Sequence, residues 1–390
     1  MPATSAPANR LRRRHRRRGR RRSAALCPAR REAKMIRDSS LIAVLLLLAC
    51  AAGAGESPPD SSESAVILQY HHIGRETPAA TSVTPAQFAA HLSHLDAAGF
   101  AVWPLGRVVE HLQRGAAFPP RCVAITFDDA YDSVLSEAWP LLQARDWPCC
   151  IFVSSGAIDA GYAGFLDWAQ MRELAAAGVC FANHSASHAH LVRRLTDESR
   201  EAWAARMREE IGACQQRLRD ELGAAPPFFA YPYGEYSPAL REIVRQLDLI
   251  GFGQQSGAVW PGSDLGVLPR FPMSGAYAEM ESFALKVHCR ALPVLRADPQ
   301  SPLRAMSDPP PVLRLHLADG DYRADQLAAY AGGERIRLVW TDREAGRLEV
   351  RAGEPLPPGR SRYNITAPER GGARYFWYSH LWIRGMEHND

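Results

Sequence analysis

The sequence predicts an α/β protein: a distorted (β/α) barrel of about seven strands, followed by a small all-β sandwich-like domain. Three observations support this fold. Between residues 65 and 252, short apolar runs alternate with amphipathic stretches of helical period. Six or more such strand–helix units fit within residues 65–294, which suits a barrel better than an open sheet. After residue 294, the pattern changes to short alternating runs separated by turn signals.

The predicted barrel strands are short apolar runs, at residues 65–70, 122–127, 149–153, 178–182, 228–231 and 250–252. The amphipathic stretches between them predict helices at residues 85–98, 105–114, 133–145, 168–177, 196–222 and 238–247. Strands that alternate with helices form parallel sheets with right-handed crossovers. We therefore expect the functional residues at the carboxyl ends of these strands.

The C-terminal part of the chain predicts a second, smaller domain. Residues 295–311 are rich in Pro, Asp and Ser and predict a linker. Beyond it, within residues 312–385, five runs predict strands, at 312–317, 335–340, 347–351, 362–366 and 374–381. The aromatic run at 375–378, together with Trp382, suits a sandwich core, with glycan binding as the alternative.

The N-terminal 56 residues predict a leader that is not part of the fold. Residues 1–34 form a basic extension with no means of building a core, interpreted as sequence upstream of a true start at Met35. Residues 35–56 predict a signal peptide or a lipoprotein signal, because a charged start precedes an apolar stretch too short to span a membrane. In the lipoprotein alternative, Cys50 carries the lipid. Residues 57–64 predict a polar linker.

Charge and cysteines narrow the functional classes. Residues 1–38 hold 14 Lys and Arg against 2 Asp and Glu, whereas the rest of the chain holds 32 against 40. This acidic body argues against nucleic-acid binding. The six cysteines after the leader match no zinc-ribbon or CxxC spacing. We expect most of them to be buried thiols, with a disulfide left open by the exported setting.

Two motifs at predicted strand ends indicate a metal site. Adjacent carboxylates such as Asp128 and Asp129 are costly to hold together unless a positive charge neutralises one of them. His184 and His188, spaced i and i+4 after another strand, are able to share an ion. One carboxylate and two histidines leave coordination positions open for water and substrate. Zn²⁺ is favoured at such a site, and Co²⁺, Ni²⁺ and Mn²⁺ stay open.

The segments Thr126-Phe127-Asp128-Asp129, His184-Ser185-Ala186-Ser187-His188 and Tyr231-Pro232-Tyr233-Gly234 together resemble three ordered motifs of the polysaccharide deacetylases, the NodB-homology or carbohydrate esterase family 4 enzymes. The resemblance covers about residues 65–294. It implies that Asp129, His184 and His188 bind the metal, that Asp128 is the general base, and that the Tyr233 N–H helps to stabilise the oxyanion.

Two features depart from the family pattern. The Arg that usually precedes the Pro-Tyr-Gly motif is Ala230 here, and Arg270, after another strand end, is the candidate to replace it. The late leucine-histidine motif for the general acid is unclear. His71 is favoured for that role, with His72 and His288 as alternatives. These departures resemble the exported branch that deacetylates β-1,6-linked N-acetylglucosamine polymers.

The resemblance implies a hydrolase of linear amide bonds that removes N-acetyl groups from an amino-sugar polysaccharide. A non-catalytic carbohydrate-binding protein and an O-acetyl esterase are the alternatives. Aromatic side chains near the motifs, among them Tyr131, Tyr231 and Tyr233, are candidates for sugar contact. We expect an exported monomer, either periplasmic or anchored to the outer membrane as a lipoprotein, that binds a polysaccharide and no nucleic acid.

Overall fold

The computed structural model describes residues 64–385. The predicted leader, Cys50 and nearly all of the linker at residues 57–64 lie outside this range. Glu56–Asp390 form one compact unit, and its described part contains both the barrel and the β domain.

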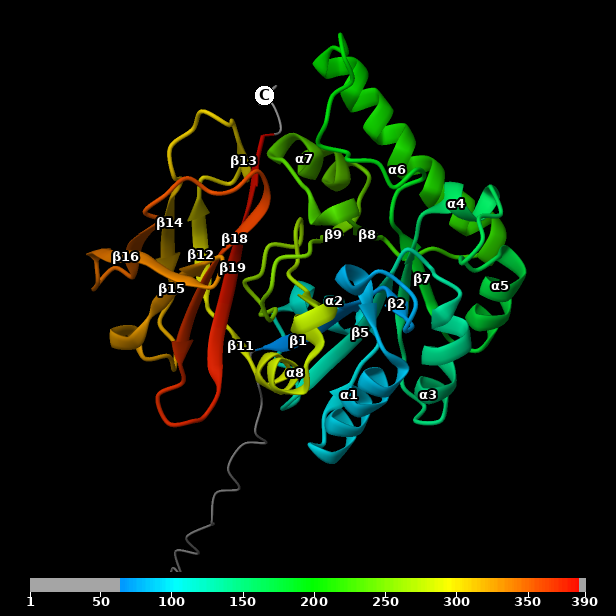
Figure 1. Cartoon of the computed structure of the whole chain (residues 1–390), viewed down its shortest axis with the longest axis horizontal. Coiled ribbons are helices and arrows are strands. Elements are labelled where there is room, and N and C mark those ends of the chain that lie inside the picture. The colour runs from blue at the N-terminus through cyan, green and yellow to red at the C-terminus, as the bar shows by residue number, and fades with distance from the viewer. Residues whose placement is uncertain (1–63, 386–390) are drawn as a thin grey trace, which may run out of the picture. The chain divides into compact units, whose positions relative to one another are not determined.

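A sheet of eight strands forms the barrel (Figure 1), in the order β10-β1-β5-β6-β7-β8-β9, with β4 beside the start of β5. Every neighbouring pair in this sheet is parallel. A parallel bridge from Phe252 to Leu268 and the pairing of Phe271 with Leu68 carry the chain from the last strand back to the first. The strands are β1 (Ala65–Tyr70), β4 (Ala101–Val102), β5 (Cys122–Asp128), β6 (Cys150–Val153), β7 (Cys180–Asn183), β8 (Phe228–Ala230), β9 (Ile250–Phe252) and β10 (Phe271–Pro272).

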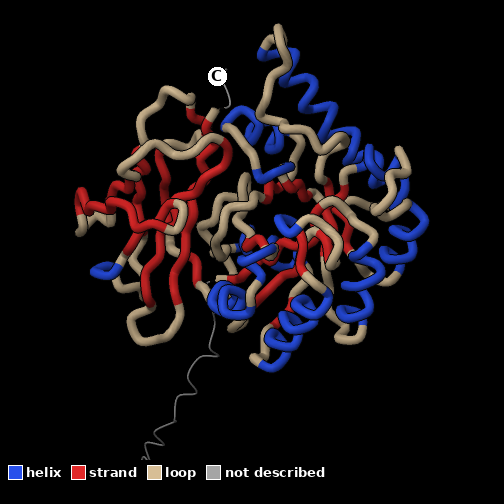
Figure 2. The backbone as a smooth tube through the Cα atoms, in the orientation of Figure 1, coloured by secondary structure: helices blue, strands red, loops and turns tan. Residues whose placement is uncertain are grey.

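Helices lie outside these strands (Figure 2). Their starts follow local sequence signals: the side chains of Thr84 and Asp167 each form a capping box with a Gln three residues later. The longest helix begins after Ser199 and ends at Gly223, whose φ of 75° suits glycine. The helices are α1 (Pro85–Ala97), α2 (Leu105–Arg114), α3 (Trp139–Gln143), α4 (Ser155–Asp159), α5 (Trp168–Ala176), α6 (Arg200–Leu222), α7 (Pro238–Gln246) and α8 (Met280–Val287).

Short elements complete the barrel domain. A five-residue π-helical turn leads directly into α3, so the predicted helix at 133–145 is present in two parts. The parallel pair β2 and β3 lies near the carboxyl end of β1. These elements are β2 (His72–Ile73), β3 (Ser82–Val83), η1 (Ala79–Thr81), η2 (Val134–Ala138), η3 (Pro232–Gly234) and η4 (Gly275–Ala278).

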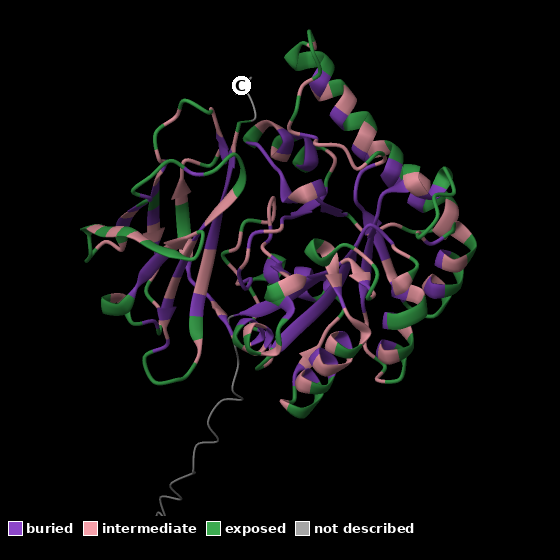
Figure 3. Ribbon diagram, in the orientation of Figure 1, coloured by how far each residue is buried: buried purple, intermediate pink, exposed green. Residues whose placement is uncertain are grey.

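The central strands are covered on both faces, as a parallel sheet requires. Every residue of β1 and of β5 is buried (Figure 3), and this includes the polar Gln69, Thr126 and Asp128. Burial of an acidic side chain inside a barrel is costly unless it is paired. The polar residues at the ends of these strands therefore mark the site that the fold has to support.

The C-terminal strands form a second sheet of nine strands, in the order β11-β19-β18-β15-β16-β17-β14-β12, with β13 beside β19. Both predicted domains are thus confirmed as folds. Trp382 is fully buried in the core of this second domain, as the core interpretation of the aromatic run expects. The elements are β11 (Arg290–Ala291), β12 (Val294–Asp298), β13 (Leu303–Arg304), β14 (Val312–Leu317), η5 (Ala324–Gln326), β15 (Ala328–Ala331), β16 (Glu334–Asp342), β17 (Arg347–Arg351), β18 (Gly359–Pro368) and β19 (Tyr375–Arg384).

The predicted linker at residues 295–311 is corrected by the structure. Most of β12 lies within it and pairs with β14 at the sheet edge, and β13 pairs with β19. The Pro and Asp residues misled the prediction, because proline is tolerated beside an edge strand. The β domain therefore begins before residue 312.

The six described cysteines are free thiols, and Cys122, Cys149, Cys150, Cys214 and Cys289 are buried, in line with the expectation of buried thiols. Cys150 and Cys180 are register partners on β6 and β7, and their sulfur atoms lie 2.8 Å apart. Within residues 64–385, no helix combines the length and apolarity needed to cross a bilayer.

Candidate active site

The site is assembled at the carboxyl ends of three barrel strands. Asp128 ends β5 and Asp129 follows it. His184 follows β7, and the carbonyl of Ala230 ends β8. Because the strands are parallel, these ends share one edge of the barrel. The structure thus brings together Asp128, His184 and Ala230, of which the first and last lie about 100 positions apart in the sequence.

Asp129, His184 and His188 form a cluster able to bind a metal ion. The ligand atoms of these three side chains lie within 4.8 Å of one another. Oδ1 of Asp129 is 3.4 Å from Nε2 of His184 and 3.2 Å from Nε2 of His188. Asp129 Oδ1 and His184 Nε2 are buried without a hydrogen-bond partner, although buried polar atoms are normally paired. Unpaired donor atoms of this kind fit a divalent ion with one carboxylate and two imidazole ligands.

The backbone fixes the orientation of the histidine ligands. Nδ1 of His184 lies 2.7 Å from the carbonyl oxygen of Ala230, which makes this nitrogen the donor and leaves Nε2 free to bind a metal. The turn that carries His188 is held by its N–H, which donates to Ser185 Oγ at 3.1 Å. Asp129, Ser185 and His188 have φ values of 75°, 68° and 55°. Such left-handed non-glycine residues concentrate at functional sites, where the fold maintains a costly conformation.

Asp128 lies beneath this cluster in a buried ion pair with Arg270. Both side chains are fully inaccessible to solvent, and two parallel hydrogen bonds of 2.6 and 2.8 Å join the guanidinium to the carboxylate. Arg270 also donates to the Gly253 carbonyl at 2.9 Å and to Thr126 Oγ1 at 3.2 Å. Ala230 stands where an arginine was expected. Arg270, directly before β10, supplies the guanidinium to Asp128 instead.

Gln69 on β1 is a further partner of this carboxylate, to which its side-chain amide donates. Sequence reasoning missed Gln69. The available signal was a polar side chain in an apolar run that is two residues from His71.

The pKa values of the two adjacent carboxylates are shifted in opposite directions. Burial alone would raise the pKa of Asp128, but the Arg270 charge and hydrogen bonds outweigh it and hold that pKa far below its usual range. Burial raises the pKa of Asp129 to about 6, with the Asp128 charge adding to the effect. Burial lowers the pKa of His184 to about 3 and also lowers the pKa of His188. The imidazoles are therefore neutral at physiological pH, which is the form that binds metals.

The histidine candidates for the general acid occupy three different settings. His71 lines the same cleft as Asp129 and His188. The ring of His72 stacks on Tyr131 with a centroid separation of 3.5 Å. His288 packs edge-on against Phe100 and belongs to a different cavity. Of the three, only His71 is among the described residues that line the catalytic cleft.

The three tyrosine candidates also differ. Tyr131 and Tyr233 line the cleft, and the Tyr131 hydroxyl partly offsets the effect of burial on the pKa of Asp129. Tyr233 has a φ of 60° and stacks on His190 at 4.0 Å. Tyr231 does not fit the predicted sugar contact, because it is fully buried and its hydroxyl donates to the Gly266 carbonyl at 2.8 Å. Its side chain points into the core, since alternate residues after a strand face opposite sides.

The cleft above the cluster has a volume of about 500 Å³, within the size range of small-ligand sites. The barrel supplies most of its wall, and strand β18 of the C-terminal domain supplies Arg360 and Arg362. Sequence reasoning did not assign these arginines. A local pattern gave no signal for them, because they reach the cleft only when the β domain packs on the barrel.

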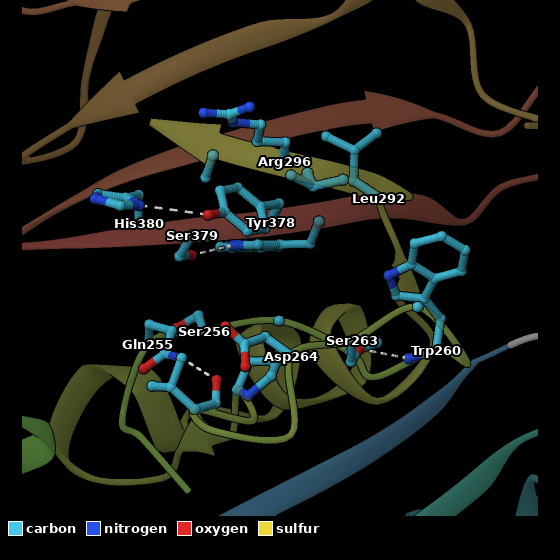
Figure 4. A pocket seen from close by; sticks show the side chains of 18 of the residues that line it. Gln255, Ser256, Trp260, Ser263, Asp264, Leu292, Arg296, Tyr378, Ser379 and His380 are labelled. Carbon is cyan, nitrogen blue, oxygen red and sulfur yellow. Dashed lines mark hydrogen bonds between the residues drawn. The ribbon is translucent and has the colours of Figure 1, made fainter. Parts of the chain in front are cut away.

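A second cavity of about 200 Å³ lies between the barrel segment around residues 255–269 and strands β12 and β19. Figure 4 shows Trp260 and Asp264 on the barrel side facing Tyr378 and His380 on β19. Ser256 borders both this cavity and the catalytic cleft. Among the described residues, the metal-capable cluster lies at the cleft and not here, so the chemistry is assigned to the cleft.

Comparison with known proteins agrees with this geometry. Residues 115–251, which include Asp128, Asp129, His184, His188 and Tyr233, match the family model described as polysaccharide deacetylase. Over these residues, which are about a third of the chain, the protein is similar to the polysaccharide deacetylases. The matched segment contains the whole metal-capable cluster but neither His71 nor Arg270.

Curated proteins that are similar to this chain are named poly-β-1,6-N-acetyl-D-glucosamine N-deacetylase. The protein from Escherichia coli K12 is 26% identical over 208 residues, which are 44% of this chain and 30% of that protein. The one from Staphylococcus aureus MSSA476 is 23% identical over 198 residues, covering 50% of this chain and 68% of that protein. The chain thus spans less than a third of the length of the E. coli relative.

Solved structures support the fold of the barrel. The Streptococcus pyogenes deacetylase PplD matches with a TM-score of 0.51 and 23% identity, over 57% of this chain and 98% of its own. IcaB from Ammonifex degensii matches with a TM-score of 0.51 and 23% identity, over 56% of this chain and 95% of its own. Each match covers slightly more than half of this chain, which is about as many residues as the barrel contains.

Proposed function

We propose that this protein is a metal-dependent hydrolase that removes N-acetyl groups from an N-acetylated amino-sugar polysaccharide, with poly-β-1,6-N-acetylglucosamine as the leading substrate class. The observation that carries the proposal is the cluster of Asp129, His184 and His188 beside the buried ion pair of Asp128, the residue that precedes Asp129, with Arg270. The deacetylase family match and the names of the curated relatives support the same reaction.

Asp129, His184 and His188 would hold the metal ion. Their donor set favours Zn²⁺ and also suits Co²⁺, Ni²⁺ or Mn²⁺. When bound, such an ion supplies Lewis-acid stabilisation of the negative charge that develops on the acetyl carbonyl oxygen.

Asp128 is the base in this proposal. Arg270 and Gln69 hold its carboxylate in one orientation, and the low pKa keeps it ionised, and therefore able to accept a proton, at any neutral pH. It takes a proton from the water that attacks the acetyl carbon. The fixed geometry matters because a base acts only within hydrogen-bond reach of the proton it removes.

His71 is the proposed acid, because it directly follows β1, the strand between β5 and β10, and lines the cleft together with Asp129 and His188. It gives a proton to the leaving nitrogen, so that acetate departs and the sugar keeps a free amine. The backbone N–H of Tyr233, in a left-handed conformation with φ 60°, is the proposed donor to the oxyanion. Tyr131 and Tyr233, each stacked on a histidine by one ring face, line the same cleft and are the proposed sugar contacts.

Two variants test these assignments. Asp128→Asn should keep the bound metal and lose nearly all acetate release, because it removes the base and leaves the ligands in place. His184→Ala should lose the metal itself, which metal analysis of the purified protein measures directly. Full activity in either variant would refute the assigned role. Acetate release from O-acetyl xylan alone would transfer the proposal to an esterase.

The proposal includes export. Export follows from the predicted signal at residues 35–56, with the periplasm or a lipid anchor at Cys50 as the destination. Mass spectrometry of the mature protein would distinguish cleavage near residue 54 from lipidation of Cys50.

A further inference from the structure

The C-terminal β domain contributes two positive charges to the catalytic cleft. Arg360 and Arg362 lie on β18 and line the cleft together with Asp129 and His188. These two arginines therefore reach the cleft from outside the barrel.

Contacts with the barrel hold both side chains at the cleft wall. Arg362 donates to the carbonyl of Gln254 at 2.9 Å. Arg360 donates to the carbonyl of Tyr233 at 3.1 Å, and its guanidinium lies 5.4 Å from the centre of the Tyr233 ring. Tyr233 and Gln254 themselves line the cleft. The arginines are thus anchored beside the motif that carries the proposed oxyanion donor.

The positive charges of Arg360 and Arg362 are only partly neutralised by neighbouring carboxylates. No carboxylate pairs with Arg362 among residues 64–385, and its Nε is buried without a hydrogen-bond partner. Arg360 lies 3.6 Å from Glu235, but that carboxylate also pairs with His190 at 2.7 Å. Lys286 is a further cation near Arg362: burial and the Arg362 charge lower the pKa of Lys286 to about 8, and its ammonium donates to the Tyr277 carbonyl at 2.8 Å.

The cleft offers little negative charge in return. Asp129 is the only carboxylate among the described residues that line it, and a bound metal would take up that charge. A sugar that keeps its acetamide is neutral and presents a carbonyl oxygen to guanidinium N–H groups. A sugar that has lost its acetyl group carries an ammonium, which two nearby guanidinium groups repel.

We propose that Arg360 and Arg362 form a charge filter, which admits a polymer whose units beside the reacting sugar are still acetylated and disfavours units already converted to amines. This inference rests on the proposed deacetylase function. It predicts that the enzyme spaces its deacetylation events along the chain, because each product amine weakens binding of the neighbouring unit. The C-terminal domain would thereby set the pattern of the product.

The test compares two defined substrates: penta-N-acetylglucosamine with β-1,6 linkages, and the same oligomer with one internal unit already a glucosamine. For the wild-type protein, we expect kcat/KM for acetate release to be about tenfold lower on the amine-containing oligomer at low salt. Sodium chloride at about 1 M should narrow the difference, because it shortens the screening length to about 3 Å. Mapping the released positions by mass spectrometry should show that units next to the amine are spared.

Single substitutions test whether the two arginines cause the difference in kcat/KM between the two oligomers. Arg362→Gln keeps a side-chain donor for the Gln254 carbonyl, removes the charge, and should reduce the discrimination towards equality. Arg360→Gln should act in the same direction and serves if the first variant does not fold. Arg335→Gln is the matched control, since it removes one charge from exposed strand β16 of the same domain and should leave the ratio unchanged.

Equal rates on the two oligomers for the wild-type protein would overturn the charge filter, as would an unchanged ratio in both cleft variants. No acetate release from either oligomer would instead overturn the proposed function, and the charge filter with it.

Discussion

Replacing Arg270 with glutamine tests whether the site depends on its buried ion pair. The change removes two hydrogen bonds to Asp128, of 2.6 and 2.8 Å, and leaves a carboxylate with no solvent exposure and one remaining side-chain partner, Gln69. Breaking a buried pair by removal of one member typically costs about 3–5 kcal/mol. We expect Arg270→Gln to lower the free energy of unfolding by that amount and to abolish turnover.

The double variant separates the interaction energy of the ion pair from the contribution of each single residue. In Asp128→Asn/Arg270→Gln no buried charge is left unpaired, so the double variant should be more stable than the sum of the two single changes implies. The interaction energy should exceed about 1 kcal/mol, since residues in direct contact couple by about 0.5–3 kcal/mol.

Urea denaturation followed by tryptophan fluorescence measures these differences. Arg335→Gln on the exposed surface is the control, and it should change the stability by no more than about 0.5 kcal/mol. A change of no more than about 0.5 kcal/mol in the free energy of unfolding of Arg270→Gln would refute the importance of the pair. Strictly additive changes in the double variant would refute it as well.

Two further predictions follow from the buried groups. Burial raises the pKa of Asp129 from 3.8 to about 6 in the folded metal-free protein. The protonated carboxyl therefore contributes to the free energy of unfolding below pH 3.8, and this contribution is lost as the pH rises through 6. Metal binding needs the ionised form, so the gain in melting temperature on adding Zn²⁺ should be larger at pH 7 than at pH 5, and an equal gain would contradict the shift. Tyr231→Phe should cost about 1 kcal/mol of stability through loss of the hydrogen bond to Gly266 and leave KM unchanged; a large rise in KM would restore Tyr231 as a substrate contact.

The barrel was predictable because its strands and helices carry strong local patterns. The run at 250–252 and the helix at 105–114 match the structure to the residue. The metal-capable cluster was predictable for a related reason: its residues follow apolar runs, and parallel strands bring such ends together.

Other features depend on contacts that no local pattern contains. In the sequence, Gln69 is one polar residue in a predicted strand. Only the structure shows that its side-chain amide donates to Asp128. Residues 295–311 read as a linker because an edge strand tolerates nearby Pro and Asp, and only the pairing of β12 with β14 shows otherwise. Arg360 and Arg362 reach the cleft through the packing of one domain on another, which sequence periodicity does not report.

The most direct measurement is the release of acetate and of free amines from N-acetylglucosamine oligomers by the purified protein, with and without a chelator. The proposed mechanism predicts acetate and amine in equal amounts, loss of both on chelation, and recovery when Zn²⁺ or another divalent ion is restored. Release that persists in protein shown to be free of metal would contradict it, as would no release with any of Zn²⁺, Co²⁺, Ni²⁺ or Mn²⁺.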